Sequence, residues 1–162
     1  MLLIPGRSLS EIARALSTLK GLEWRLQETR ALLAEHKSER YSMDSQRHVL
    51  ERTGDINNLM EIKSRTVALD KAIADLVASE TECLARIASA RRYLKGLNGR
   101  LDDLRREAAG LSEQLASNQI PPDLVPQVRT TLRRVEMQIE ALGEDSEFAT
   151  AVEPVGAKTS RY

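Results

Sequence analysis

Residues 59–115 read LMEIKSRTVALDKAIADLVASETECLARIASARRYLKGLNGRLDDLRREAAGLSEQL. A mostly apolar series, the seam, recurs here in alternating steps of three and four residues: Leu59, Ile62, Thr66, Leu69, Ile73, Leu76, Glu80, Cys83, Ile87, Ala90, Leu94, Leu97, Leu101, Leu104, Ala108, Leu111 and Leu115. Only Thr66 and Glu80 interrupt its apolar character. A period of 3.5 held for about eight heptads indicates a long helix that packs along its length against other helices.

Two breaks bound this stretch. Gly54 suits the left-handed residue that ends a helix, and Asp55 suits the N-cap of the next helix. Pro121 and Pro122 end the long helix and can open another one. After them a further seam runs in threes and fours, through Val125, Val128, Leu132, Val135, Ile139 and Leu142.

On the N-terminal side, Ser8 and Glu11 form a capping box that predicts a helix start at Leu9. The sequence thus predicts helices at about 9–53, 56–117 and 122–142, in a helical domain of residues 1–143. Residues 144–162 contain proline and glycine without a period, and are expected to form a flexible tail.

The predicted fold class is all-α: an extended antiparallel coiled coil of three long helices, with helical hairpins along a long central helix and a flexible C-terminal tail. A turn at Gly54 places Leu33 near Leu76, because short connections favour antiparallel neighbours. The alternative is a compact four-helix bundle folded at Gly96 and Gly99. The seam keeps its register across these glycines, which favours a continuous helix.

Composition supports long helices over a globular core. Of 162 residues, 30% are charged and 41% hydrophobic, but only 3% are aromatic. The 24 basic residues balance the 24 acidic residues, so no global field steers the chain toward nucleic acid. The opening MLLIPGRS is too short for a cleavable signal peptide, and no apolar run reaches the roughly 20 residues of a membrane span. The expected location is the cytoplasm, or a virion or other assembly.

No catalytic, cofactor or metal site is predicted. Cys83 lies on the seam, where a cysteine acts as a small hydrophobic residue, whereas a catalytic thiol needs a cationic, partly exposed setting. Asp44, His48 and Glu51 can share one helix face, but a bundle metal site needs a second such group on a facing helix. An exposed ion-pair face is the simpler interpretation. Nucleotide-binding and nucleophile motifs are absent.

Basic residues concentrate between residues 86 and 106. The candidates for a basic patch are Arg86, Arg91, Arg92, Lys95 and Arg100. Clustered cations can bind phosphates, although no aromatic set for base stacking accompanies them. Pairing with acidic residues of the first helix, such as Glu23, is the favoured interpretation, and nucleic-acid binding is the alternative.

Two features suggest protein interfaces. The first helix has its own seam, which includes Leu22, Leu26 and Leu33, and Trp24 lies one step off it. There Trp24 either covers an edge of the hairpin or anchors a partner. A second apolar row runs beside the main seam, through Val67, Ala74, Val77, Leu84 and Ala88. Two apolar faces on one helix indicate contacts from two sides, which predicts a homo-oligomer or a larger complex.

The expected function is therefore non-enzymatic and structural: a coiled-coil rod or spacer within a larger complex, such as a virion, a tail or a secretion apparatus. The alternatives are a nucleic-acid-binding accessory protein that uses the basic segment, and a small helical adaptor or chaperone that holds one protein partner.

Overall fold

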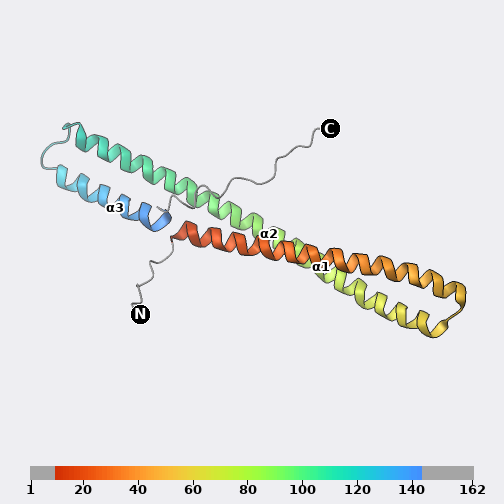
Figure 1. Cartoon of the computed structure of the whole chain (residues 1–162). Helices are drawn as coiled ribbons and strands as arrows, with labels where there is room; N and C mark the ends of the chain where they lie inside the picture. The colour runs from red at the N-terminus through yellow and green to blue at the C-terminus, as the bar shows by residue number, and fades with distance from the viewer. Residues whose placement is uncertain (1–9, 144–162) are drawn as a thin grey trace, which may run out of the picture. The chain divides into compact units, whose positions relative to one another are not determined.

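The structure, a computed structural model, describes residues 10–143. It contains helices α1 (Glu11–Thr53), α2 (Ile56–Ala116) and α3 (Val125–Gly143), shown in Figure 1. Helix accounts for 92% of this part of the chain, which has no strand, so the all-α prediction is confirmed. The predicted tail at 144–162 and the predicted cap at Ser8 lie outside the described residues.

Local side-chain hydrogen bonds explain where α1 and α2 begin. Ser10 caps α1, since its Oγ accepts from the backbone N of Ala13 at 3.2 Å. Gly54 has a φ of 71°, as predicted for the residue that ends α1. The Oδ1 atom of Asp55 accepts from the backbone N of Asn58 at 3.3 Å, which is the N-cap contact expected for α2.

The connection between α2 and α3 differs from the expectation. α3 begins at Val125, later than the predicted 122, because the backbone N of Leu124 donates to the carbonyl of Pro121 at 2.9 Å and closes a turn. Pro126 then falls in the first helical turn, where its missing N–H leaves no bond unmade. Before this turn Asn118 adopts a φ of 53°, a left-handed conformation that asparagine tolerates.

The described chain forms two compact units, divided after Ser17 and after Arg91. The hairpin unit, residues 18–91, contains most of α1 and the first half of α2. Figure 1 shows these two segments side by side, joined at Gly54. The buried apolar side chains come from both helices at seam spacing: Leu19, Leu26, Leu33, Met43, Ile62, Leu69, Cys83 and Ile87.

Ion pairs join the two helices of the hairpin unit. Arg30 Nε lies 2.8 Å from Glu80 Oε1, and Arg91 Nη2 lies 3.1 Å from Glu23 Oε1. Glu80, one of the two polar residues of the seam, is therefore neutralised from α1. The other, Thr66, directs its Oγ1 toward Met43 Sδ at 3.9 Å, which is a weak contact.

Polar residues also enter the α1 side of the hairpin near the turn. His36, Arg40 and Arg47 are all partly buried. The Nδ1 atom of His36 is buried without a hydrogen-bond partner. Close to the turn, partly buried polar side chains therefore accompany the buried apolar residues Met43 and Ile62.

The second unit contains α3, the second half of α2 and the start of α1, residues 10–17 and 92–143 of the described chain. Its core consists of five buried residues from α2 and α3: Leu97, Leu101, Val135, Ile139 and Leu142. Ile12 and Ala15 pack against this core from α1. In addition, Tyr93 donates its hydroxyl to Glu11 Oε1 at 3.0 Å. This bond raises the pKa of Tyr93, because losing the proton would set two negative charges side by side.

Helix α2 passes through Gly96 and Gly99 as one helix. Neither glycine has a positive φ, and a Cβ atom at either position would meet nothing within 4 Å. Neighbouring Leu94 and Leu97 are both buried, so the packing of the seam holds the helix together here. The four-helix alternative needs a turn at these glycines, which α2 does not contain.

Candidate interaction surfaces

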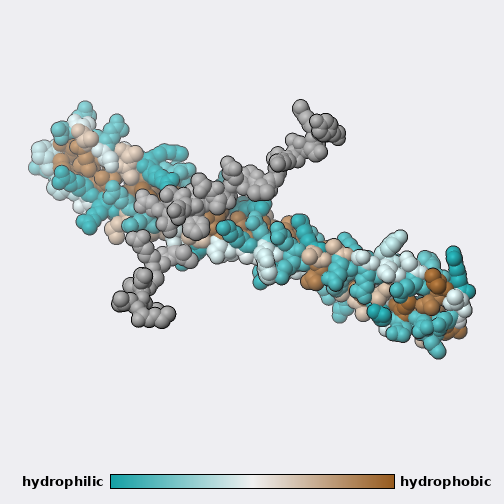
Figure 2. Space-filling view, in the orientation of Figure 1, coloured by the Kyte–Doolittle hydropathy of each residue, from teal (hydrophilic) through white to brown (hydrophobic). Residues whose placement is uncertain are grey.

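Helix α2 exposes an apolar row on the hairpin unit, away from its buried seam. Val67 is 70% exposed, Val77 43% and Leu84 42%. The row continues toward the turn through two further exposed residues, Ile56 and Met60, which the sequence analysis did not include. We call the whole row the outer stripe: Ile56, Met60, Val67, Ala74, Val77, Leu84 and Ala88. Apolar surface near the turn is visible in brown in Figure 2.

Trp24 lies on α1 and is 62% exposed. More than half of its surface is thus open to solvent, whereas its neighbours Leu19 and Leu26 are buried. Large exposed aromatic side chains are favoured anchors in protein interfaces. The exposure of Trp24 keeps it as an interface candidate on α1.

The basic candidates are all exposed, and they are divided between the two units. In the hairpin unit, Arg86 pairs with Glu82 at 3.2 Å within α2, and Arg91 pairs with Glu23 across to α1. The pairing expected for Arg91 is therefore present. In the second unit, no ion pair within the described chain involves Arg92, Lys95 or Arg100. These three cations remain available to a ligand.

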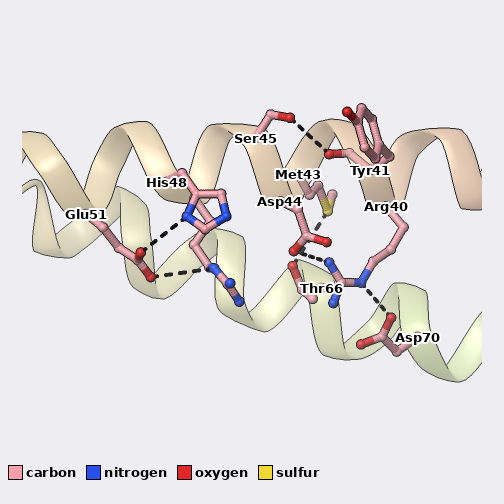
Figure 3. A network of polar contacts seen from close by, with 10 residues as sticks. Arg40, Tyr41, Met43, Asp44, Ser45, His48, Glu51, Thr66 and Asp70 are labelled. Carbon is pink, nitrogen blue, oxygen red and sulfur yellow. Dashed lines mark hydrogen bonds and ion pairs between the residues drawn. The ribbon is translucent and has the colours of Figure 1, made fainter.

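A charged network crosses the hairpin unit near its turn (Figure 3). Arg40 Nε lies 2.7 Å from Asp70 Oδ1 on α2, and Arg40 Nη1 donates to Asp44 Oδ1 on its own helix. The hydrogen bond from Arg40 lowers the pKa of Asp44, because it stabilises the ionised carboxylate. The pKa of Arg40 is raised, mainly by its hydrogen bond to Asp70 and then by its hydrogen bond to Asp44. The sequence analysis missed this network. The one sign of it in the sequence is that Arg40 falls on the three-and-four spacing of the buried residues of α1.

His48 and Glu51 form the exposed ion-pair face that the sequence suggested. His48 Nδ1 lies 3.7 Å from Glu51 Oε2, and Arg47 Nε lies 3.5 Å from Glu51 Oε1. Asp44 faces Arg40 instead. Within residues 10–143, no group of three or more histidine, cysteine, aspartate or glutamate side chains is arranged to hold a metal ion.

An open groove of about 540 Å³ lies between α1 and α2 beside the turn. Its lining mixes polar and apolar side chains from both helices: Ser42, Ser45, Gln46, Val49, Leu50, Asn58, Glu61, Ile62 and Arg65. Glu61 and Arg65 are the two charged residues of this lining. The groove was not anticipated from the sequence, because heptad spacing gives no measure of the gap between two helices.

Cys83 is 4% exposed, and its Sγ donates to the backbone carbonyl of Leu22 at 3.2 Å. This agrees with its expected role as a small seam residue. Within the described chain, no helix combines the length and the apolar character that crossing a membrane requires. Comparison with protein-family models, with curated proteins and with solved structures finds no match for the chain.

Proposed function

We propose that the chain is a non-enzymatic structural subunit, a coiled-coil spacer in a larger protein assembly. In this proposal α1 pairs with the first half of α2 as an antiparallel coiled coil, and α3 pairs with the second half of α2 in the same way. The kinds of assembly proposed are a virion, a tail or a secretion apparatus.

The observation that carries the proposal is the pattern of ion pairs in the hairpin unit. As residue numbers rise in α1 from Glu23 to Arg30 to Arg40, those of their partners fall from Arg91 to Glu80 to Asp70. Oppositely charged residues that pair between two helices help to set the partner and the orientation of coiled-coil helices. The scarcity of aromatic residues adds support, because it suits a narrow aliphatic seam rather than a pocket.

The antiparallel pairing is tested by crosslinking within one chain. Cysteines at Glu23 and Arg91, in a Cys83→Ala background, should be joined by a short bis-maleimide, since the native side chains are 3.1 Å apart. The matched control pairs Glu23→Cys with Ser64→Cys, which lies 27 residues and about 40 Å along α2 from Arg91. Linkage of the control but not of the first pair would contradict the proposed pairing.

The assembly role is tested in the native source. The tagged chain should sediment in a particle much larger than 18.1 kDa and keep a fixed ratio to its neighbours through high-salt washing. Recovery of the chain only as a small free species would contradict a structural role and favour the adaptor or chaperone alternative.

Nucleic-acid binding is the second candidate, favoured by the exposed Arg92, Lys95 and Arg100. Phosphate contacts make affinity fall steeply with salt, with a slope near −0.9 for each contact on duplex DNA. Replacing Lys95 with Ala should then reduce the slope by about one. We expect no tight duplex binding at physiological salt, because the acidic and basic residues of the chain balance.

A further inference from the structure

The outer stripe of α2 has a symmetric spacing. Leaving aside Ala74, its members follow one another at intervals of 4, 7, 10, 7 and 4 residues: Ile56, Met60, Val67, Val77, Leu84 and Ala88. The sequence of intervals is the same in both directions, and its midpoint is residue 72. A stripe with this symmetry is complementary in spacing to an antiparallel copy of itself.

We propose that the outer stripe binds the outer stripe of a second copy of the chain, about a two-fold axis near residue 72. In a two-fold interface, residue i contacts residue j and residue j contacts residue i. Met60 then meets Leu84 of the second copy, and Val67 meets Val77 of the second copy. Ile56 lies opposite Ala88 in the same way. This inference deepens the proposed function, on which it rests, by naming the partner of this surface.

The charges on the same face favour the antiparallel direction. Lys63 and Asp70 occupy the two charged positions on this face between Met60 and Ala74, one on each side of Val67. A parallel pair would set each of them against its own copy, and like charges that face each other at seam positions are destabilising. In the antiparallel pair, Lys63 lies opposite Thr81 and Asp70 lies opposite Ala74.

The same residues fix the register. Moving the second copy by one heptad in either direction sets Arg91 opposite Met60, or Asp70 opposite Val67. The first shift leaves two distinct apolar pairs and the second leaves one, whereas the proposed register has three. A charged side chain set against an apolar one loses apolar packing and must give up water, which disfavours both shifted registers.

Asp70 at the centre of the interface is already neutralised within its own chain. Its Oδ1 lies 2.7 Å from Arg40 Nε, and the contact approaches from α1. A second copy therefore covers an ion pair and not a lone carboxylate, which lowers the cost of removing water. Trp24 and the basic residues of the second unit lie outside this stripe and stay available to other partners.

The interface is tested first by a charged substitution with a matched control. Replacing Val77 and Leu84 with Glu should raise the dissociation constant of the dimer by at least about 100-fold. The two substitutions remove the apolar pairs with Val67 and Met60 of the second copy, and the two-fold axis repeats each pair. The control replaces Leu32 and Val49 of α1 with Glu, which are similarly exposed but outside the outer stripe. Sedimentation equilibrium measures the constant, and circular dichroism confirms that both variants remain helical. Equal effects of the two variants would overturn the proposal.

The register is tested by disulfide formation in a Cys83→Ala background. Chains carrying Val67→Cys and differently tagged chains carrying Val77→Cys should form a mixed disulfide on oxidation, while neither chain alone forms one. The antiparallel register places position 67 about ten residues, or about 15 Å, from its own copy. Disulfides from Val67→Cys chains alone would show a parallel pair and overturn the proposal.

A full-length chain that stays monomeric at about 100 μM, with no mixed disulfide, would also overturn the proposal. The crosslink between Glu23→Cys and Arg91→Cys separates this result from failure of the proposed function. If that crosslink forms in a monomer, the helical hairpin stands and only the dimer is wrong. If it does not form, the coiled coil itself is wrong.

Discussion

Replacing Gly96 and Gly99 with Ala should stabilise the protein. Both glycines lie inside α2 with ordinary helical backbone, both are exposed, and an added Cβ meets no atom within 4 Å. Alanine therefore brings its helix propensity without a steric cost, which is worth about 1 kcal/mol at each site. The double variant should gain about 2 kcal/mol in the free energy of unfolding, or about 4–8 °C in melting temperature for a chain of this size.

Ellipticity at 222 nm during urea and thermal unfolding measures this gain, at one protein concentration because any self-association makes the midpoint depend on concentration. Gly54→Ala is the matched control. Its φ of 71° disfavours a Cβ, so this variant should lose about 1 kcal/mol although nothing lies within 4 Å of the added atom. A double variant that is less stable than the natural chain would show that α2 turns at these glycines, and would refute the reasoning from helical continuity.

Three further outcomes are expected. Arg91→Ala should lower the free energy of unfolding by no more than about 1 kcal/mol, because Arg91 is largely exposed and its partner Glu23 is partly exposed. A loss above about 2 kcal/mol in urea titrations would contradict this. The pKa of Asp44 in the folded chain lies below its ordinary value of 3.8, so its contribution to stability is present above pH 3.8 and is lost as the pH falls through the folded pKa. Arg40→Gln should therefore weaken the loss of stability at acid pH, which urea unfolding at a series of pH values measures. Finally, Cys83 should react with a thiol reagent only at the rate of unfolding and promptly in urea; fast reaction under native conditions would place the thiol outside the seam.

The sequence predicted the helices well, because the heptad spacing and the breaks act locally. Gly54 and Asp55 occupy the roles their residue types suggested. The start of α3 was predicted too early, because whether Pro122 or Pro126 opens a helix depends on a turn closed by one backbone bond at Leu124.

The candidate surfaces were only partly predictable. Val67, Val77 and Leu84 were recognised from their spacing, but Ile56 and Met60 were not, because a row that starts at a helix end has no preceding turn to reveal its period. The contacts of Arg40 depend on the distance between two helices, which no spacing within one helix encodes. The groove beside the turn escapes sequence analysis for the same reason.

The uneven packing of the hairpin unit has a kinetic consequence. Near the turn, polar side chains such as Arg40 and Thr66 are partly buried between the helices, whereas far from it Leu26 and Ile87 are buried beside the small side chains of Thr29 and Cys83. Contacts around Leu26 and Ile87 close a loop of tens of residues, and doubling the length of a loop costs only about 0.6 kcal/mol. The folding nucleus should accordingly form around Leu26 and Ile87, so that truncating these side chains slows folding, whereas changes at Gly54 mainly speed unfolding.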